Sequence, residues 1–377
     1  MVVDERAGTT IDRRSFLRKS TAVGSGVFAA ALIGSLSPGL LRIEGNASGL
    51  SPDGHGAHDG HGGHGGHDDK PHGHGFSGSK LERLNLSPLS LDGVQTRLGI
   101  LSDAHICDYD LTALGKLTAA WETLAWAAPG ISAHFLLGDV TLNGTESEMD
   151  LFATQTAETL MACYATVPTT HLLMGNHDWL GCGQTQFESY FAGHDRAQYF
   201  ASKQDTVELV GGATIIKLNG SGVDCAERDM MDYTVAYDFL AAALEETTAH
   251  RPDDAILVMA HEPPMNRGLL GEYECGYYGQ GTSLDMVELM TRYPQLRLFS
   301  GHIHNPLDMP ETINTDLGFT SVYTSTVGSC LFVRGELVGK QDTDSQGLVL
   351  DIMEDGRLVL HRLIFNSREY LGQPVEL

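Results

Sequence analysis

Short apolar runs that end in polar residues alternate with longer amphipathic stretches from about Leu91 onward. The apolar runs predict strands, and their ranges are 97–103, 133–139, 169–176, 255–261 and 296–302. The amphipathic stretches predict helices, and their ranges are 111–128, 146–163, 236–250 and 284–293. The segment VELVGGATIIKLNG predicts a hairpin, and residues 320–365 predict several strands separated by Gly-containing turns. Alternating strands and helices indicate an α/β fold with a more antiparallel C-terminal part.

Each of the five predicted strands before residue 305 ends in residues that can bind metal or move protons. These residues are Asp103, His105, Asp139, Asn176, His177, Asp178, His261, His302 and His304. The quartet Gly175–Asp178 follows an apolar run directly, which predicts that it ends a strand and opens a loop. Because ligands gather at the carboxyl ends of strands in an α/β sheet, we expect these side chains to lie close together.

A single Asp or His at a strand end has an ordinary structural explanation, as a helix cap or a packed side chain. Five such strand ends at one edge of a sheet do not fit that explanation. Carboxylates and imidazoles packed together need a compensating charge, because burying them without one is costly. Metal ions supply that charge, so the pattern predicts a metal centre.

Composition and charge narrow the class of partner. The chain has 377 residues, of which 42% are hydrophobic, so it is long enough for a substantial core. Its 24 basic and 49 acidic residues give a net charge of −25. This argues against nucleic acid and against anionic membrane surfaces, which both require a basic face. High solubility is the plainest consequence of the charge.

The N-terminal stretch resembles a twin-arginine export signal. Arg13 and Arg14 lie side by side and are followed by residues 20–41, which carry no charged side chain. Cleavage near Ala47 makes residues 1–47 a signal peptide, read by the twin-arginine export machinery. An uncleaved membrane anchor is the alternative, although four glycines in the uncharged stretch disfavour a permanent span. The predicted location is the periplasm or the cell exterior, with attachment to the membrane if the signal is kept.

A His- and Gly-rich segment follows the predicted signal. Residues 48–80 contain almost no large apolar side chains, which predicts a disordered linker that continues to residue 92. Seven histidines within it, five of them at every third position from His55 to His67, predict loose binding of Zn, Ni or Cu ions. A soluble tether that happens to be His-rich is the alternative. We place the catalytic domain at 93–366 and a C-terminal tail at 367–377.

The six cysteines do not define a metal site. None of them forms a CxxC pair, so a thiolate zinc site is not indicated. Pairing in an oxidising compartment and burial as small apolar groups both remain open.

Taken together, the motifs resemble the calcineurin-like metallophosphoesterases. D-x-H, G-D, G-N-H-D, a later His and G-H-x-H follow in that order, and the resemblance spans roughly Val94 to Phe365. It implies a four-layer αββα sandwich with two mixed β-sheets and a two-metal site. By this resemblance one metal is bound by Asp103, His105, Asp139 and His304. The second is bound by Asp139, Asn176, His261 and His302, with Asp139 bridging the two.

The ligand types fit two divalent or trivalent ions such as Fe, Mn, Zn or Co. Two ions of this kind can generate hydroxide from a bridging water and clamp an in-line displacement at phosphorus. His177 is predicted to donate a proton to the leaving oxygen or to stabilise the charged phosphoryl oxygens. Asp178 is predicted to orient His177, with capping of the following turn as the alternative. Loading with metal before twin-arginine export favours Fe or Mn.

Departures from two subfamilies indicate the substrate class. Protein Ser/Thr phosphatases place a phosphate-binding Arg where this chain has Asn143, and purple acid phosphatases place a ligand Tyr where it has Leu142. The sequence therefore predicts an exported hydrolase of a small-molecule phosphodiester or phosphomonoester, nucleotide-like or glycerophosphodiester-like. Arg267 is a candidate phosphate contact, and the Tyr- and Gly-rich stretch 271–281 a candidate rim loop. The alternative function is a periplasmic metal-handling protein that uses the His-rich segment.

Overall fold

Two mixed β-sheets form the centre of the computed structural model, which describes residues 11–12, 81–223, 231–263, 282–309, 312–328, 330–331, 341–342 and 344–377. The export signal other than Ile11–Asp12, the linker up to residue 80, Arg267 and the stretch 271–281 lie outside these residues. The helices that the structure describes include none long and apolar enough to cross a bilayer.

The larger sheet has nine strands. Its order is β2 (Arg83–Asn85), β19 (Glu369–Leu371), β18 (Leu358–Ile364), β17 (Gln346–Met353), β3 (Val94–Leu101), β4 (Ile131–Leu137), β5 (Thr169–Leu173) and β6 (Phe200–Ala201), and β20 (Val375–Glu376) pairs with β18. Strands β3 to β6 run parallel, whereas β17 joins β3 antiparallel. The C-terminal strands thus close one side of a parallel sheet.

The second sheet has seven strands. Its order is β1 (Ile11–Asp12), β7 (Thr206–Val210), β8 (Ala213–Leu218), β11 (Ile256–Ala260), β12 (Leu296–Ser300), β14 (Thr320–Tyr323) and β13 (Ile313–Asn314). Strands β8, β11, β12 and β14 are parallel, and β7 and β8 form the predicted hairpin. Two small pairs lie outside both sheets: β9 (Ser221–Val223) with β10 (Met231–Asp232), and β15 (Cys330–Leu331) with β16 (Gln341–Asp342).

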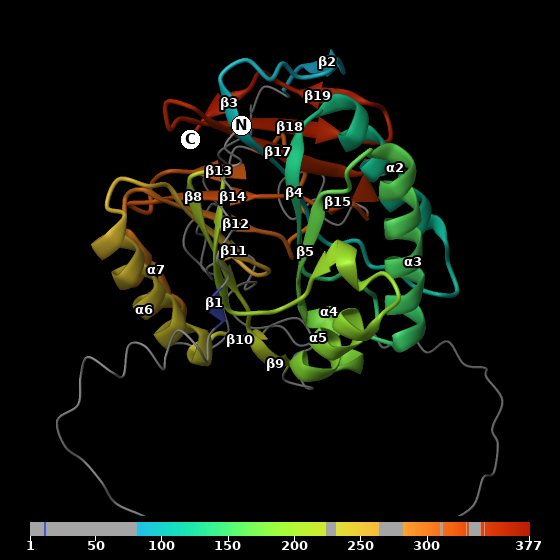
Figure 1. Ribbon diagram of the computed structural model, residues 1–377, viewed down its shortest axis with the longest axis horizontal. Coiled ribbons are helices and arrows are strands. Elements are labelled where there is room, and N and C mark those ends of the chain that lie inside the picture. The colour runs from blue at the N-terminus through green and yellow to red at the C-terminus, as the bar shows by residue number, and fades with distance from the viewer. Residues whose placement is uncertain are drawn as a thin grey trace, which may run out of the picture. The chain divides into compact units, whose positions relative to one another are not determined.

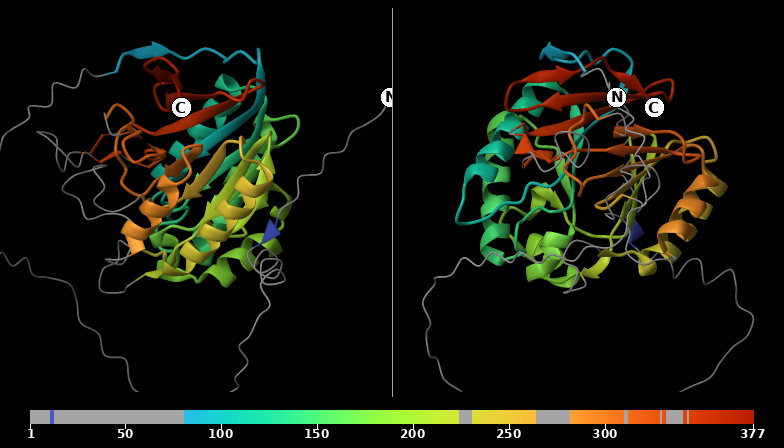
Figure 2. Two further views of the ribbon diagram at one scale, coloured as in Figure 1. Left: turned by 90° about the vertical axis from the view of Figure 1, so that its left-hand side faces the viewer. Right: turned by 180° about the vertical axis from the view of Figure 1, so that it is seen from behind.

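Helices cover the outer faces of the two sheets. Figure 1 shows α2 (Thr112–Ala127) and α3 (Glu146–Cys163) beside the larger sheet, and α6 (Thr234–His250) and α7 (Thr282–Thr291) beside the other. The view from behind in Figure 2 shows the same order of layers. Shorter helices α4 (Asn176–Gly181), α5 (Gln184–Gly193) and η1 (Ala197–Tyr199) follow β5. The predicted four-layer αββα sandwich with two mixed sheets is confirmed.

Strands of both sheets are buried on both faces, and successive residues therefore belong to different cores. In β11, Ile256 and Val258 pack with α6 and α7, whereas Leu257 and Met259 face the other sheet. In a strand, side chains alternate between the two faces, so a doubly covered strand is a nearly continuous apolar run. This explains why the strand signals in the sequence were apolar runs and did not alternate between apolar and polar residues.

Three features differ from the sequence-based expectations. The quartet Gly175–Asp178 opens helix α4 and not a loop, because Asp178 caps the helix start by accepting from the Gly175 amide. Residues 81–92, predicted as linker, contribute β2 to the large sheet. The predicted tail 367–377 contributes β19 and β20. These short strands lack the apolar runs that identified the others, and β2 pairs with β19, which lies at the other end of the catalytic domain in sequence.

A buried ionic network joins the two sheets at the β5–β7–β8 side. Glu208 of β7 lies 3.1 Å from His171 Nδ1 of β5, across the gap between the sheets. Lys217 of β8 lies 3.5 Å from the same carboxylate and donates to the Ala201 carbonyl of β6 at 3.2 Å. Burial opposes ionisation of Glu208, but His171 and Lys217 outweigh it and lower its pKa to about 2. The network therefore holds the sheets together as long as Glu208 is charged.

Replacing Glu208 with Gln leaves Lys217 buried beside a neutral partner, so we expect it to lower the free energy of unfolding at pH 7 by roughly 3–5 kcal/mol. Because the folded-state pKa lies below the unfolded value, this contribution is complete above the ordinary glutamate pKa of 4.5 and disappears as the pH falls toward about 2. Urea denaturation of both proteins at several pH values measures the difference. Glu122→Gln, which changes a half-exposed side chain, is the matched control. A difference that does not shrink toward low pH would contradict the assignment.

Candidate metal centre

The ends of five parallel strands bring seven ligand-type side chains together. Strands β3, β4 and β5 of one sheet and β11 and β12 of the other end at this place. The side chains, in chain order, are Asp103, His105, Asp139, Asn176, His261, His302 and His304. They are the residues that the sequence pattern selected as candidate ligands.

Four of these residues form a first group around Asp103. His304 Nε2 lies 3.2 Å from Asp103 Oδ1 and 2.9 Å from His105 Nε2. His105 Nε2 also lies 3.6 Å from Asp139 Oδ2. The four ligand atoms all lie within 4.8 Å of one another, so one ion can contact all of them.

Asp139 also belongs to a second group. His261 Nε2 lies 3.4 Å from Asp139 Oδ2 and 3.0 Å from Asn176 Oδ1. The Asn176 oxygen is 3.1 Å from His302 Nδ1. Since its carboxylate reaches both groups, Asp139 can bridge two ions. The described residues thus fit a dinuclear centre by the chemistry and spacing of their donors, which suit Fe, Mn, Zn or Co.

Five of the seven residues have a left-handed backbone. Their φ angles are 55° at Asp103, 48° at His105, 48° at Asp139, 70° at His302 and 53° at His304. Residues other than Gly rarely adopt this region, and each such residue costs of the order of 1–3 kcal/mol. The surrounding fold must hold these turns in place, which fixes the directions of the ligand side chains.

Two glycines let the strand-end turns approach one another. A Cβ atom at Gly175 would meet the Asp139 carboxylate, and one at Gly301 would meet Ser102 Oγ and the Asp103 carboxylate. The close approach at Gly301 makes a hydrogen bond possible, in which the His302 amide donates to Asp103 Oδ2 at 2.9 Å. Glycine at these two positions therefore allows carboxylates of one sheet to contact the turns beside them.

Charges in the two groups compensate each other in pairs. Burial opposes a charge on His261, but Asp139 outweighs it and raises the pKa of His261 to about 10. Asp103 likewise raises the pKa of His304 against the effect of burial. Burial lowers the pKa of His105 to about 4 and that of His302 to about 3, so both rings are neutral near pH 7. An ion bound in each group would take the place of an imidazolium proton as the compensating charge.

His177 and Asp178 do not contact each other in the way that the sequence predicted. His177 Nδ1 lies 2.8 Å from the Leu142 carbonyl, and its amide donates to Asp139 Oδ1 at 2.9 Å. Its ring packs edge-on against His105, with centroids 4.6 Å apart. The predicted orientation of His177 by Asp178 is therefore wrong, because a backbone carbonyl takes that place.

Asp178 instead joins two of the strand-end turns. Its buried carboxylate accepts from the Thr141 amide at 2.9 Å, from the Thr141 hydroxyl at 2.7 Å and from the Val140 amide at 3.2 Å. It also accepts from the Gly175 amide at 2.9 Å. Val140 follows Asp139 and Gly175 precedes Asn176, so Asp178 positions one ligand of each turn. The structure therefore shows the alternative role for Asp178, in which its carboxylate caps the turn at Gly175.

A loop from the C-terminal part of the chain, which sequence reasoning missed, supports Asp103. The Thr326 hydroxyl donates to the Asp103 carbonyl at 2.9 Å, and the Gly328 amide donates to the same oxygen at 3.1 Å. The Val327 amide donates to the Ser102 carbonyl at 2.9 Å. Thr326 follows an apolar strand as the ligands do, but Thr is not a usual metal ligand, so no chemical signal marked it.

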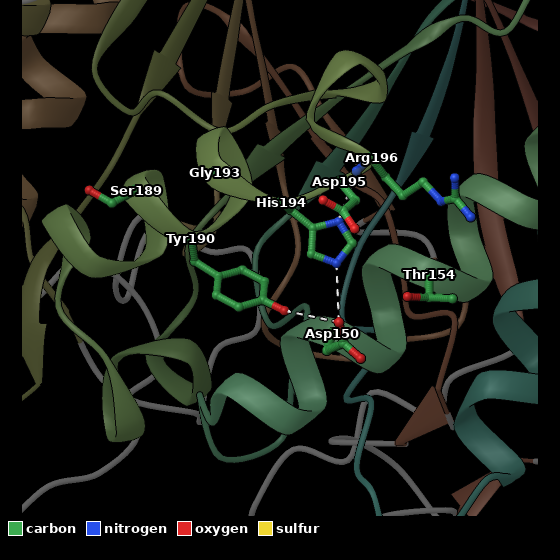
Figure 3. Close-up of a pocket in the computed structure, with 8 residues that line it drawn as sticks. All are labelled: Asp150, Thr154, Ser189, Tyr190, Gly193, His194, Asp195 and Arg196. Carbon is green, nitrogen blue, oxygen red and sulfur yellow. Dashed lines mark hydrogen bonds and ion pairs between the residues drawn. The ribbon is translucent and has the colours of Figure 1, made fainter.

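Two cavities lie apart from the seven ligand-type residues. Figure 3 shows one of about 550 Å³ between α3 and α5, where the side chains of His194 and Tyr190 both point to Asp150. His194 Nδ1 accepts from the Arg196 amide at 3.1 Å, so both of its ring nitrogens are used in local contacts. The second, of about 580 Å³, has the Glu208 network as part of its lining. Neither cavity is lined by a residue of the metal centre.

A family model for calcineurin-like phosphoesterases matches residues 96–306. This range contains all seven ligand-type residues as well as His177 and Asp178. No match was found among curated proteins.

Several solved structures are similar to the chain. A purple acid phosphatase from yellow lupin (Lupinus luteus) seeds matches with 15% identity and a TM-score of 0.47, covering 74% of this chain and 53% of the lupin protein. The chain thus spans about half the length of that relative. A phosphopantetheinyl hydrolase from Mycobacterium tuberculosis matches with 15% identity, a TM-score of 0.40 and coverages of 62% and 91%. A cold-active protein-tyrosine phosphatase of a Shewanella species matches with 16% identity, a TM-score of 0.32 and coverages of 73% and 80%.

Replacing Asp178 with Asn puts an amide donor where the carboxylate accepts from three backbone amides and a hydroxyl. We expect the affinity for metal to fall roughly 10–100-fold, as for other groups that orient metal ligands. Competition with a chelator, followed by metal analysis of the purified variant, measures the change. Asp195→Asn, on the exposed rim of the Figure 3 cavity, is the control and should bind metal as the wild type does. Unchanged affinity in Asp178→Asn would show that the two turns hold their ligands without it.

Proposed function

The chain belongs to the calcineurin-like phosphoesterase family, and we propose that it is an exported enzyme that hydrolyses a small-molecule phosphodiester or phosphomonoester. Family membership identifies it as a metal-dependent hydrolase of phosphoester bonds. The observation that carries the proposal is the convergence of two ligand groups on the shared carboxylate of Asp139.

The residues that hold the ions are those of the two groups. Asp103, His105 and His304 would hold one ion and Asn176, His261 and His302 the other, with Asp139 shared between the two groups. When bound, such ions polarise the phosphoryl oxygens and activate a water molecule for attack. The protein's own contribution is to keep the donors in place through strained turns and the Asp178 contacts.

His177 is the residue best placed to move a proton. A carbonyl oxygen only accepts, so the 2.8 Å contact with Leu142 places a proton on Nδ1 and leaves Nε2 for the reaction. The His177 amide is fixed on Asp139, which keeps the ring beside the ligand groups. In its imidazolium form, Nε2 donates to the oxygen of the leaving group or to a charged phosphoryl oxygen.

Two residues beside the centre support a small-molecule substrate. Asn143, at the place of the phosphate-binding Arg of protein Ser/Thr phosphatases, is bonded to Glu148 through its amide at 2.9 Å and its side chain at 2.7 Å. Leu142 stands where purple acid phosphatases have a ligand Tyr, and its carbonyl faces His177. The lack of both side chains supports the proposal of a small-molecule substrate, nucleotide-like or glycerophosphodiester-like.

Export by the twin-arginine route, a periplasmic or extracellular location and a preference for Fe or Mn are parts of the same proposal. They rest on the N-terminal sequence, with Arg13 and Arg14 followed by an uncharged stretch. A metal-handling function of the His-rich segment is the second candidate, favoured by the regular spacing of its histidines. Deletion of residues 48–80 separates the two, because hydrolysis should persist while any metal-buffering role of the segment is lost.

The decisive experiment is hydrolysis of p-nitrophenyl phosphate and bis-p-nitrophenyl phosphate by protein reconstituted with Mn, Fe, Co or Zn. We expect activity with at least one substrate, and a loss of roughly 10²–10³-fold or more in Asp139→Ala, since several kcal/mol of transition-state stabilisation depend on the ions. Removal of metal with a chelator should abolish the activity, and adding it back should restore it. Asp195→Ala, outside the centre, should retain full activity. Inactivity of the wild type under every metal would contradict the proposal and direct attention to the His-rich segment.

A further inference from the structure

We propose that the carboxylate of Glu148 orients His177 through a single peptide group, the one that joins Leu142 to Asn143. The proposal rests on the proposed hydrolase function, because His177 is the candidate proton donor of that reaction. It assigns to Glu148, a residue of helix α3, the positioning role that the sequence predicted for Asp178.

The peptide group between Leu142 and Asn143 is held at both of its polar ends. On one side, the Leu142 carbonyl accepts a hydrogen bond from His177 Nδ1 at 2.8 Å. On the other side, the Asn143 amide donates to Glu148 Oε2 at 2.9 Å. Because a trans peptide group is planar, its carbonyl and its amide point in opposite directions. Anchoring the Asn143 amide therefore also fixes the direction of the carbonyl that His177 contacts.

The Glu148 carboxylate is itself held in place. The residue is only 1% exposed. Its Oε1 accepts from the Asn143 side chain at 2.7 Å, and its Oε2 also accepts from the Thr145 amide at 3.3 Å. Glu148 lies in the first turn of α3, where the helix dipole favours a negative charge. A fixed acceptor thus faces the Asn143 amide.

Capping of helix α3 alone does not account for these contacts. Thr145 and Glu148 form a capping box, in which the glutamate side chain accepts only from the Thr145 amide. At 3.3 Å this is the longest of the three hydrogen bonds to the carboxylate, and the two shorter ones both come from Asn143. The carboxylate therefore holds the loop that contacts His177 more closely than it holds the start of its own helix.

The charge of Glu148 strengthens the hydrogen bond that His177 makes. Hydrogen bonds in a chain polarise one another, so a peptide group that donates to a carboxylate becomes a better acceptor at its carbonyl. The stronger acceptor keeps a proton on His177 Nδ1 and keeps the ring in one orientation. Nε2 is then the nitrogen that gives its proton to the oxygen of the leaving group, while Nδ1 retains its own.

Glu148→Gln is the variant that tests this role. Glutamine also forms a capping box, so the helix start is kept, but the charge is lost and an NH2 group faces one of the Asn143 donors. Thr145→Ala is the control for the helix start, because it removes the hydroxyl that accepts from the Glu148 amide and leaves the bonds to Asn143 in place. Glu158→Gln, which changes an exposed glutamate of the same helix, is the control for charge.

The dependence of the rate on the leaving group reports on the proton donor. p-Nitrophenolate is a weak base that departs without a proton, whereas phenolate, whose conjugate acid has a pKa of about 10 like the Tyr side chain, requires one. We expect Glu148→Gln to lower kcat for a phenyl ester about tenfold and for the corresponding p-nitrophenyl ester by clearly less. KM and metal content should stay unchanged.

The two control variants should keep the wild-type ratio of the two rates, although Thr145→Ala should unfold at a lower temperature. If Glu148→Gln loses metal, or if the ratio of its two rates equals that of the wild type, Glu148 only braces the loop and the proposal is overturned.

NMR spectroscopy of the histidine rings tests the same contact without turnover. The ring signals of His177 in Zn-loaded protein are assigned by their loss in His177→Asn. We expect the wild type to carry a proton on Nδ1, and Glu148→Gln to show faster exchange of this proton with solvent and an upfield shift of its resonance. Identical His177 signals in the two proteins overturn the proposal even if no ester is hydrolysed. That inactivity would separately contradict the proposed function.

Discussion

The rest of the site depends on the contacts between the buried carboxylate of Asp139 and the groups around it. This carboxylate lies within 3.4–3.6 Å of histidines from both ligand groups and receives the amide of His177. A charge in this position is stable only if cations surround it, whether imidazolium protons or metal ions. The strand-end turns, the glycines that let them approach and the Asp178 contacts all hold donors around that one group. Both sheets therefore contribute to the site. The large sheet supplies the carboxylates of Asp103 and Asp139, and the second sheet supplies histidines that lie beside them.

Much of the fold, and the convergence of the candidate ligands at one place, could be predicted because both depend on local signals. Strands covered on both faces are nearly continuous apolar runs, as in β11, and polar residues directly after them mark the turns. Asp103, Asp139 and Asn176 were identified in this way without knowledge of the strand order. The rule that parallel strands end at one edge then placed them together.

What could not be predicted depends on contacts between distant parts of the chain. The partner of the His177 ring is a backbone carbonyl, and no side-chain pattern indicates a carbonyl. Asp178 follows His177 in sequence, yet its carboxylate turns to amides of another strand end. The same holds for the Glu208 network, whose members come from three strands of two sheets. The identity and spacing of the residues indicated the chemistry of the site. The contacts that orient those residues could be found only from the folded structure.

The hydrogen bonds from Thr326 and Gly328 to the Asp103 carbonyl have a consequence for the order of events during folding. They join residues separated by more than 220 positions, and such long-range contacts form late because the intervening chain must first be ordered. During synthesis, strands β3 to β5 can emerge and pair well before this support for Asp103 exists. The seven candidate ligands and the support for Asp103 are therefore complete only once the chain has folded as far as Gly328, which follows β14 of the second sheet. Tight binding of both ions would then indicate that both sheets, and not only strands β3 to β5, have folded.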